Sequence, residues 1–486
     1  MKLTETPIIF TQSKKNVSGF QLPSTCIPEL NPESIIDQSM LRNKPARLPE
    51  ISEPEVVRHF TNLSVKNHHV DKDFYPLGSC TMKYNPKIND KLASHSKIIS
   101  LHPDEKDSNI QGALKIMYEL EIFLSKMTGM NRFTLQPTAG SQGEFVGLLM
   151  MQKYHRKKGN NKKYIIIPET AHGTNPASVV LGGYKTLQVQ SNDNGRVDIE
   201  HLKSLMSDQI AGMMLTQPNT LGLFEDEIEE ITKIIHQYDG LMYMDGANLN
   251  ALIGLVKPEK MGFDILHINL HKTFSTPHGG GGPGAGPIGV VENLVEFLPI
   301  PMIKKVDDRY SWDFDYPNSI GQIHTFYGNY GILVRAWAYI RTLGEEGVKQ
   351  MTRQAIINAN YLKKKIEDVY EVPFSEGTLH EFVASGKAQK KRGIKVLDIA
   401  KSLLDYGYHA PTIYFPINIP EAMMMEPTES ETKETLDAFA QALIEIDKKI
   451  TENPQELLDA PITTPVKRLN ETKANRELNL KFDYEI

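Results

Sequence analysis

The hydrophobic pattern between residues 108 and 300 alternates between two periods. Short apolar runs of strand length recur in it, at Tyr164–Pro168, Thr186–Val189, Ala211–Leu215, Leu241–Met244 and Ile265–Leu270. Between them lie amphipathic stretches such as Glu225–Tyr238, where isoleucines recur at helical spacing. Strands that alternate with helices predict an α/β fold, with a mostly parallel sheet covered by helices on both faces.

The pattern changes on both sides of this region. Residues 1–105 are predicted to form an N-terminal arm followed by a loop segment, because the first part is irregular and Tyr75–Pro86 is full of turn formers. Residues 106–330 form the predicted large domain. A long helical segment, Tyr330–Leu362, opens the third part, residues 331–486, which is predicted to be a smaller C-terminal α+β domain with a polar tail. Arms of this kind commonly wrap a neighbouring subunit.

Composition and charge limit the kinds of molecule that the protein is expected to bind. The chain is 40% hydrophobic and 23% charged, and its net charge of -6 gives no reason to expect nucleic acid or an anionic membrane. Two cysteines fit a reducing compartment and exclude a disulfide framework. No apolar run approaches the roughly 20 residues of a membrane span, and no secretory signal is apparent. We therefore expect a cytoplasmic protein.

Two polar residues stand where neighbouring apolar strands end. Asp245 directly follows Leu241–Met244, and Lys272 follows Ile265–Leu270 after one intervening residue. In parallel sheets, ligands bind at the carboxyl ends of the strands. A pyridoxal phosphate (PLP) site has this layout: the lysine holds the aldehyde as a Schiff base, and the aspartate keeps the pyridine nitrogen protonated. Taken alone, each residue would be a surface lysine or a turn aspartate, but the combination favours the cofactor.

A candidate phosphate cradle lies upstream of these residues. Ala139, Gly140 and Ser141 form a turn that leads into an apolar helix from Phe145. Backbone N–H groups and the dipole at a helix N-terminus stabilise a phosphate dianion. Gly140 lets the backbone approach closely, and Ser141 adds a hydroxyl donor. The sequence thus predicts that the cofactor phosphate is held here.

Four further residues are candidates for contacts around the ring. His172 follows a buried strand and can stack on the pyridine face, and Ala247 is small enough for the ring to lie close above it. Asn219 ends another strand and could hydrogen-bond the 3-hydroxyl, while His271 flanks the lysine. Each also has a structural reading, since a lone histidine after a strand is more often a packing residue.

The order of these groups along the chain is informative. Phosphate loop, stacking histidine, polar strand end, aspartate and lysine follow one another as in fold-type I PLP-dependent transferases, the aspartate aminotransferase-like fold. No metal-ligand spacing, Walker loop or dinucleotide fingerprint competes, and we expect no metal. Gly279–Gly286 lacks the Lys-Ser/Thr pair of a nucleotide loop. Its glycines are instead expected to let the backbone approach the cofactor or a partner subunit closely.

Six long motifs make the resemblance specific. They are Asn269–Phe274, Ala171–Ser178, Met244–Asn248, Pro76–Pro86, Phe326–Gly331 and Met425–Ser430. Through them the chain resembles the glycine-cleavage-system P-protein, the decarboxylating glycine dehydrogenase, over nearly its whole length. One departure is Pro137–Ser141, where the family commonly has asparagine and alanine nearer the glycine.

The resemblance implies an activity and an assembly. The chain is similar to subunit 2, the lysine-bearing polypeptide of the split form, which pairs with a homologous subunit 1 in a heterotetramer with two copies of each. Its implied reaction is decarboxylation of glycine, with PLP bound covalently at Lys272 and with His172 and Asp245 as further catalytic residues. The aminomethyl group goes to the lipoyl arm of the H-protein, so no NAD is needed. His278 and Tyr75–Pro86 are candidates for the walls of the lipoyl channel.

Two other interpretations stay open at this point. The chain could be another fold-type I PLP enzyme, such as an aminotransferase or a cysteine desulfurase. It could also be a non-catalytic structural subunit that supports an active partner. The presence of both Lys272 and Asp245 argues against the second, because a scaffold has no need of that pair.

Overall fold

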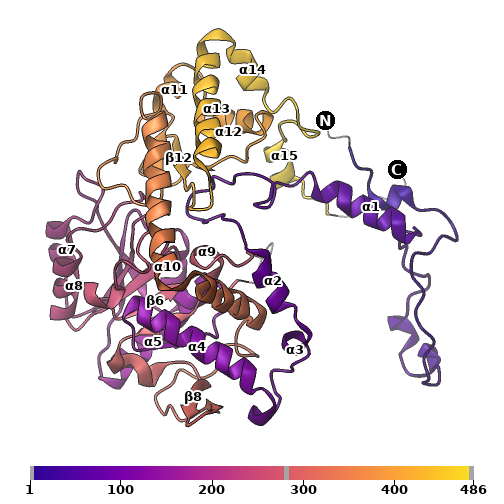
Figure 1. The fold of residues 1–486 in the computed structure, drawn as a ribbon, viewed down its shortest axis with the longest axis horizontal. Helices are drawn as coiled ribbons and strands as arrows, with labels where there is room; N and C mark the ends of the chain where they lie inside the picture. Colours follow the sequence, from indigo (N-terminus) through magenta and orange to yellow (C-terminus); the bar gives the residue numbers. More distant parts are fainter. Residues whose placement is uncertain (1–4, 279–283, 481–486) are drawn as a thin grey trace. The chain divides into compact units, whose positions relative to one another are not determined.

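The computed structural model describes residues 5–278 and 284–480. It divides into two compact units, Val70–Ala460 and the pair of terminal segments Met1–His69 and Pro461–Ile486, which are treated separately here. The larger unit contains both of the main sheets (Figure 1). The predicted boundaries after residues 105 and 330 stay predictions.

A seven-stranded sheet forms the centre of the larger unit. Its strands are β1 (Arg132–Thr134), β2 (Tyr164–Pro168), β3 (Lys185–Val189), β4 (Ile210–Thr216), β5 (Leu241–Gly246), β6 (Ile265–Ile268) and β7 (Ile288–Val290). The order is β1-β7-β6-β5-β4-β2-β3. The five strands from β3 to β6 are parallel, and β7 runs antiparallel to both β6 and β1. The predicted fold class, a mostly parallel sheet of the fold-type I PLP-transferase kind, is confirmed.

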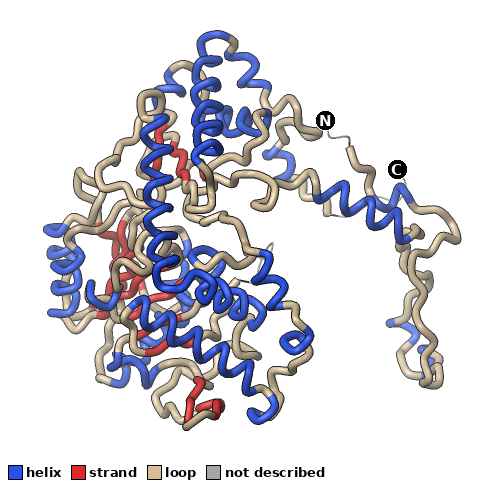
Figure 2. The backbone as a smooth tube through the Cα atoms, viewed as in Figure 1, coloured by secondary structure: helices blue, strands red, loops and turns tan. Residues whose placement is uncertain are grey.

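Helices cover both faces of this sheet (Figure 2). The helices of this part of the chain are α4 (Gln111–Thr128), α5 (Gly140–Lys157), α6 (Thr174–Leu181), α7 (Ile199–Leu205), α8 (Ile228–Gln237) and the single turn α9 (Leu270–Thr273), with 3-10 helices η4 (Asp107–Asn109), η5 (Pro258–Met261) and η6 (Glu292–Phe297). Successive side chains of a strand point to opposite faces. Met242 and Met244 of β5 therefore pack with α8, and Tyr243 packs with α5. Both faces are covered by apolar packing, and the strand ends are left for function.

A second, antiparallel sheet has the order β10-β12-β11. The strands of this sheet and the helices in the same part of the chain are α10 (Tyr330–Ile366), β10 (Phe382–Ser385), α11 (Lys387–Lys391), α12 (Val396–Asp405), β11 (Thr412–Ile413), β12 (Ala422–Met425), α13 (Lys433–Glu452) and α14 (Pro454–Asp459). Leu362, Phe382 and Phe439 lie in its core. The long helix predicted from Tyr330 is present, but it breaks at Gly344, whose φ of 64° is a conformation that glycine adopts without strain.

The remaining elements of the larger unit lie outside the two sheets. They are α2 (Lys87–Ala93), α3 (Ser96–Ile99) and the hairpin of β8 (Met302–Val306) and β9 (Arg309–Asp313). The predicted loop Tyr75–Pro86 is attached to the second sheet, since the Gly78 N–H donates to the carbonyl of Met424 at 3.2 Å. A Cβ at Gly78 would stand 2.2 Å from the Met424 side chain, so only glycine fits this approach.

The terminal unit contains α1 (Glu53–Ser64), α15 (Glu471–Arg476) and the 3-10 helices η1 (Ile9–Gln12), η2 (Pro32–Ser34) and η3 (Gln38–Met40). Between residues 20 and 48 it exposes many large apolar side chains, among them Phe20, Leu22, Ile27 and Met40. Leu22 is 83% exposed. Apolar groups left in water at this density are typical of a surface that another chain covers. Among the described residues, no helix is both long enough and apolar enough to cross a membrane.

Candidate active site

A cavity of about 220 Å³ lies at the carboxyl ends of β4, β5 and β6. Six of the residues predicted from the sequence line it: Gly140, Ser141, His172, Asp245, Ala247 and Lys272. They come from segments more than 130 residues apart, and the parallel order of the strands brings them together. This space is many times the roughly 10–15 Å³ of cavity volume that one water molecule needs.

Lys272 follows the end of β6, in the short helical turn α9. The residue is half-buried, and its side chain lines the cavity. Within the described part of the chain, its amine makes no hydrogen bond and no ion pair. The lysine is therefore open to a ligand in the cavity.

Asp245 lies at the end of β5 and is 3% exposed. Asn175 donates a hydrogen bond to its Oδ2 at 3.0 Å, and the Ala247 N–H donates to Oδ1 at 3.0 Å. Burial raises the pKa of this carboxyl, but His267, Asn175 and Ala247 outweigh burial and hold the pKa below its ordinary value. Asp245 is thus a permanent negative charge in the cavity wall.

The predicted phosphate cradle is formed by the first turn of α5. Gly140 and Ser141 line the cavity, while Ala139 is the N-cap residue and contributes its backbone outside the lining. A Cβ at Gly140 would stand 2.3 Å from Oδ1 of Asn269, which is buried without a hydrogen-bond partner in the described structure. The turn is therefore open only because residue 140 is glycine, and it leaves polar groups at the start of an 18-residue helix for an anion.

His172 lies between β2 and α6 and faces the cavity. Its Nδ1 is 2.9 Å from the hydroxyl of Thr174, which donates to Glu144 at 2.8 Å. Burial lowers the pKa of His172, so the ring is neutral at pH 7. Burial, together with the charge of Asp245, raises the pKa of Glu144 to about 7. A neutral ring held in this way is suited to stacking on a planar ligand.

Besides Ala139, two of the predicted residues are not brought to the cavity wall, Asn219 and His271. Asn219 is buried beside it, where its amide donates to the Gly195 carbonyl at 2.9 Å and its Oδ1 accepts from Leu221 and Leu223. His271 packs its ring against His278 at 5.0 Å, and burial lowers its pKa to about 3. Both side chains shape the loops around the site. Residues 279–283 of the glycine run lie outside the described residues.

Sequence reasoning missed an acidic group on the opposite wall. His380 and Glu381 precede β10 and line the cavity, and Glu426 follows β12 directly behind Glu381. All three side chains are buried. A glutamate next to an apolar strand run, as in Ala422–Met425, was the available signal, but nothing in the sequence places that strand near Lys272.

The loop Tyr75–Pro86 joins this wall to the lysine. Its Ser79 lines the cavity, and its buried Lys83 donates to the Thr273 carbonyl at 2.8 Å and to Glu429 at 2.7 Å. Thr273 is the next residue after Lys272. The buried Lys83 thus holds the backbone next to Lys272 in place.

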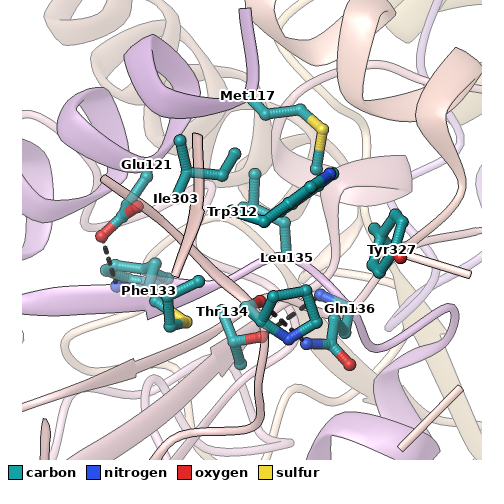
Figure 3. A pocket seen from close by; sticks show the side chains of 11 residues that line it. Met117, Glu121, Phe133, Thr134, Leu135, Gln136, Ile303, Trp312 and Tyr327 are labelled. Carbon is teal, nitrogen blue, oxygen red and sulfur yellow. Dashed lines mark hydrogen bonds between the residues drawn. The ribbon is translucent and has the colours of Figure 1, made fainter. Parts of the chain in front are cut away.

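A second pocket shows a different kind of interior (Figure 3). It is lined by residues of α4, β1, the β8–β9 hairpin and the loops beside them, among them Glu121, Gln136, Trp312 and Tyr327. Its volume is about 20 Å³, which is room for one water molecule. Glu121 forms an ion pair with Arg132, and the rings of Trp312 and Tyr327 lie 4.2 Å apart. This pocket is a packing gap.

Comparisons with known proteins agree with this geometry. A family model described as glycine cleavage system P-protein matches residues 21–311, and one described as glycine dehydrogenase, C-terminal domain, matches residues 351–464. A relative from Listeria innocua, named probable glycine dehydrogenase (decarboxylating) subunit 2, is 50% identical over 100% of both chains. A relative of the same name from Caldanaerobacter subterraneus is 52% identical, covering 96% of this chain and 97% of the other.

Solved structures show the same fold at low sequence identity. A glycine decarboxylase (P-protein) of the glycine cleavage system in inhibitor-bound form has a TM-score of 0.71 at 19% identity, covering 85% of this chain and 94% of that one. A cysteine desulfurase from Thermococcus onnurineus NA1 has a TM-score of 0.60 at 16% identity, covering 78% and 97%. At such identities the likeness concerns the fold alone.

Proposed function

This chain belongs to the glycine cleavage system P-protein family, and from that premise we propose that it is the lysine-bearing subunit of a two-subunit glycine decarboxylase. One observation carries the proposal: an unpaired lysine amine and a buried, ionised aspartate share one cavity at adjacent strand ends. A lysine and an aspartate so placed are the two groups that hold PLP. The same pair argues against a purely structural subunit.

The residues of the cavity fit PLP. Asp245 would face the ring nitrogen, Lys272 the aldehyde, and the turn at Gly140 and Ser141 the phosphate, with His172 against the ring face. The unpartnered polar atoms of the wall, among them Oδ1 of Asn269, fit a ligand that brings its own donors and acceptors. When bound, PLP supplies an electron sink for the electron pair left behind as CO2 departs from glycine.

The contributions of the chain itself are positioning and charge. Asn175 and the Ala247 N–H orient the Asp245 carboxylate, and the burial of that carboxylate strengthens its pairing with a protonated ring nitrogen. Lys83 fixes the backbone beside Lys272. Thr174 keeps His172 oriented by a hydrogen bond to its ring. These contacts hold the charged and reactive groups in fixed positions, which is how an active site stabilises developing charge.

The partners follow from the family. The relatives' name, subunit 2, supports a second subunit, which we propose is a homologous chain without the lysine, with two copies of each in the assembly. The exposed apolar side chains between residues 20 and 48 are suited to contact with it. A lipoyl-bearing H-protein is the proposed acceptor of the aminomethyl group. The composition and the two free cysteines favour the cytoplasm.

The decisive assay is the exchange of labelled carbon between bicarbonate and the carboxyl group of glycine. It uses this chain together with subunit 1 and the lipoylated carrier. Exchange is expected with all three components, and the isolated chain should show little. No exchange, combined with amino transfer to a keto acid or with release of sulfur from cysteine, would replace the proposal with an aminotransferase or a desulfurase.

The lysine itself is tested by Lys272→Ala. Loss of the covalent attachment should remove the borohydride-reducible visible absorbance and lower exchange by at least about 10³-fold. Lys260→Ala, an exposed lysine in η5, is the matched control and should behave as the unchanged protein. If Lys272→Ala kept a reducible absorbance band, the lysine would be wrongly assigned.

A further inference from the structure

The acidic wall opposite Lys272 is formed by the second sheet. Strands β10 and β12 pair with Phe382 opposite Met425, so Glu381 and Glu426 stand opposite each other just beyond the ends of the strands. Ligand atoms of these two carboxylates and of His380 all lie within 4.8 Å of one another. Two like charges directly opposite across a sheet repel, and burial removes the water that would screen them. One of the two must hold a proton.

The hydrogen bonds decide which one. Glu426 is 0% exposed and accepts from the Thr81 backbone at 3.0 Å, from the Thr81 hydroxyl at 2.7 Å and from the Asn248 amide at 3.0 Å. Within residues 5–278 and 284–480, Glu381 accepts one hydrogen bond, from the Ser79 N–H at 2.8 Å to its Oε2. Donors stabilise the ionised form, so the charge belongs on Glu426 and the proton on Glu381.

The surroundings of Glu381 also favour its protonated form. His380 is neutral, because burial lowers its pKa to about 3, and its ring nitrogens have no hydrogen-bond partner within the described residues. The thiol of Cys80 also faces this wall, and burial raises its pKa. Lys272 lowers the pKa of Glu381 and that of Glu426 alike, so it does not distinguish the two carboxyl groups. Burial and the charge of Glu426 raise the pKa of Glu381 to about 8.

We propose that Glu381 is the general acid of the reaction, and that its carboxyl group protonates the sulfur that leaves when the disulfide of the carrier opens. This rests on the proposed function, which supplies a disulfide as the acceptor. Glu381 lines the cavity and Glu426 lies behind it, so only Glu381 can reach a sulfur in the cavity. Glu426 is the positioning residue that keeps the proton on its neighbour.

The bonds and electrons balance. The glycine carbon, using the electron pair left by CO2, forms a bond to one sulfur, and the S–S bond breaks. The second sulfur takes that electron pair and receives the Glu381 proton, which leaves a thiol and a carboxylate. The carbon is oxidised and the disulfide is reduced by two electrons. The next glycine arrives with an ammonium group that must lose a proton before its nitrogen can react, and the Glu381 carboxylate is the base that takes it.

The first test uses the leaving group. Glu381→Gln keeps the size of the side chain and its hydrogen bond from the Ser79 N–H, but an amide is too weak an acid to protonate the leaving sulfur. With the natural aliphatic disulfide, transfer should fall by about 10²-fold or more. With an aromatic disulfide probe, whose thiolate leaves without a proton, the deficit should shrink to within a few-fold. An equal deficit with both disulfides would mean a structural role and would overturn the proposal.

A second test needs no turnover. The infrared spectrum of the protein without added glycine, minus that of Glu381→Gln, should show the band of one protonated carboxyl at pH 7. Glu144, whose pKa is about 7, is present in both proteins and does not account for such a difference. Glu376→Gln, the same change on an exposed residue five positions before Glu381, should give no such difference band. A difference spectrum of Glu381→Gln without the band would place the proton elsewhere and refute the proposal. One tightly bound divalent metal per chain, lost in His380→Ala, would also refute it, because these three side chains could ligate an ion.

A third readout is the pH dependence of stability. The folded chain keeps the Glu381 proton up to a pH of about 8, whereas the unfolded chain releases it near the ordinary glutamate pKa of 4.5. The contribution of this group to stability is therefore lost as pH rises between these two values. Glu381→Gln should flatten that part of the profile, and an unchanged slope would contradict a shifted carboxyl. This readout and the infrared band stand even if glycine decarboxylation itself fails.

Discussion

Two interior pockets of the larger unit bury acidic side chains and treat them in opposite ways. In the small pocket of Figure 3, Glu121 is paired with Arg132, a cation that does not lose its proton at neutral pH. In the cavity at the strand ends, Glu144, Asp245 and Glu381 surround the single lysine, Lys272. The first arrangement neutralises its charge internally. The second leaves an excess of negative charge, which is resolved by protons, by hydrogen bonds or by a ligand.

The difference teaches how to recognise a functional interior. Burial alone does not distinguish the two, because Glu121 and Asp245 are each 3% exposed. The two differ in whether a cation of the protein already neutralises the buried acid, as Arg132 does for Glu121. A pocket of about 20 Å³ whose acid is already ion-paired offers a ligand neither space nor a free partner. A cavity of about 220 Å³ offers both, because the Lys272 amine has no partner among the described residues. Perturbed groups in a cleft are the expected mark of an active site.

The largest effect is expected for Asp245→Asn, which tests whether the charged residues of the larger cavity are functional. The amide keeps the shape and the hydrogen bond to the Ala247 N–H but loses the charge that holds the ring nitrogen protonated. Exchange activity should fall by at least about 10²-fold, since the lost interaction acts in a buried site. Cofactor absorbance and the thermal unfolding midpoint, measured together, separate lost chemistry from lost folding. Full activity in this variant would remove Asp245 from the site.

The structural half of the comparison is tested by Glu121→Gln. Removing one partner leaves the Arg132 guanidinium with an uncompensated charge in the interior, so the free energy of unfolding should fall by about 3 kcal/mol. Exchange activity per folded molecule should be unchanged. Denaturant unfolding gives the first quantity, and the labelled-carbon assay gives the second.

A matched double variant sharpens this result. Glu121→Met with Arg132→Met replaces the pair by apolar groups of similar length and should recover most of the loss. If the double variant were as unstable as the single one, packing and not charge would account for the effect. A change in activity in either variant would make the small pocket part of the catalytic machinery.

The sequence predicted this contrast only in part. Strand periodicity and chain order were enough for the parallel sheet, and they identified Lys272 and Asp245, because groups at the carboxyl ends of adjacent parallel strands must lie close together. Glu381 could not be found this way. It directly precedes a strand of an antiparallel sheet more than 100 residues after Lys272, and no local sequence pattern encodes how that sheet packs against the strand ends.

Two residue assignments show a second limit. His271 is next to Lys272, but the segment begins a helical turn at Leu270 where a continued strand was predicted. Successive residues of a helix point about 100° apart, so the histidine and the lysine face different surroundings. Asn219 follows the end of β4 as predicted, but its own turn uses its amide group to hold Leu221 and Leu223. Position at a strand end does not fix where a side chain points.

The smallest expected effect belongs to Gln136→Leu in the small pocket. Its Nε2 donates to the Pro301 carbonyl at 3.1 Å, while its buried Oε1 has no partner within the described residues. Leucine removes the hydrogen bond of Nε2, which lowers stability, and the buried unpaired Oε1, which raises it. The free energy of unfolding should therefore change by no more than about 1 kcal/mol. Activity should not change, because no group of this pocket lines the cavity at Lys272. A loss above about 2 kcal/mol in denaturant unfolding would mean that Oε1 holds an ordered water and that this pocket, too, is completed by something it binds.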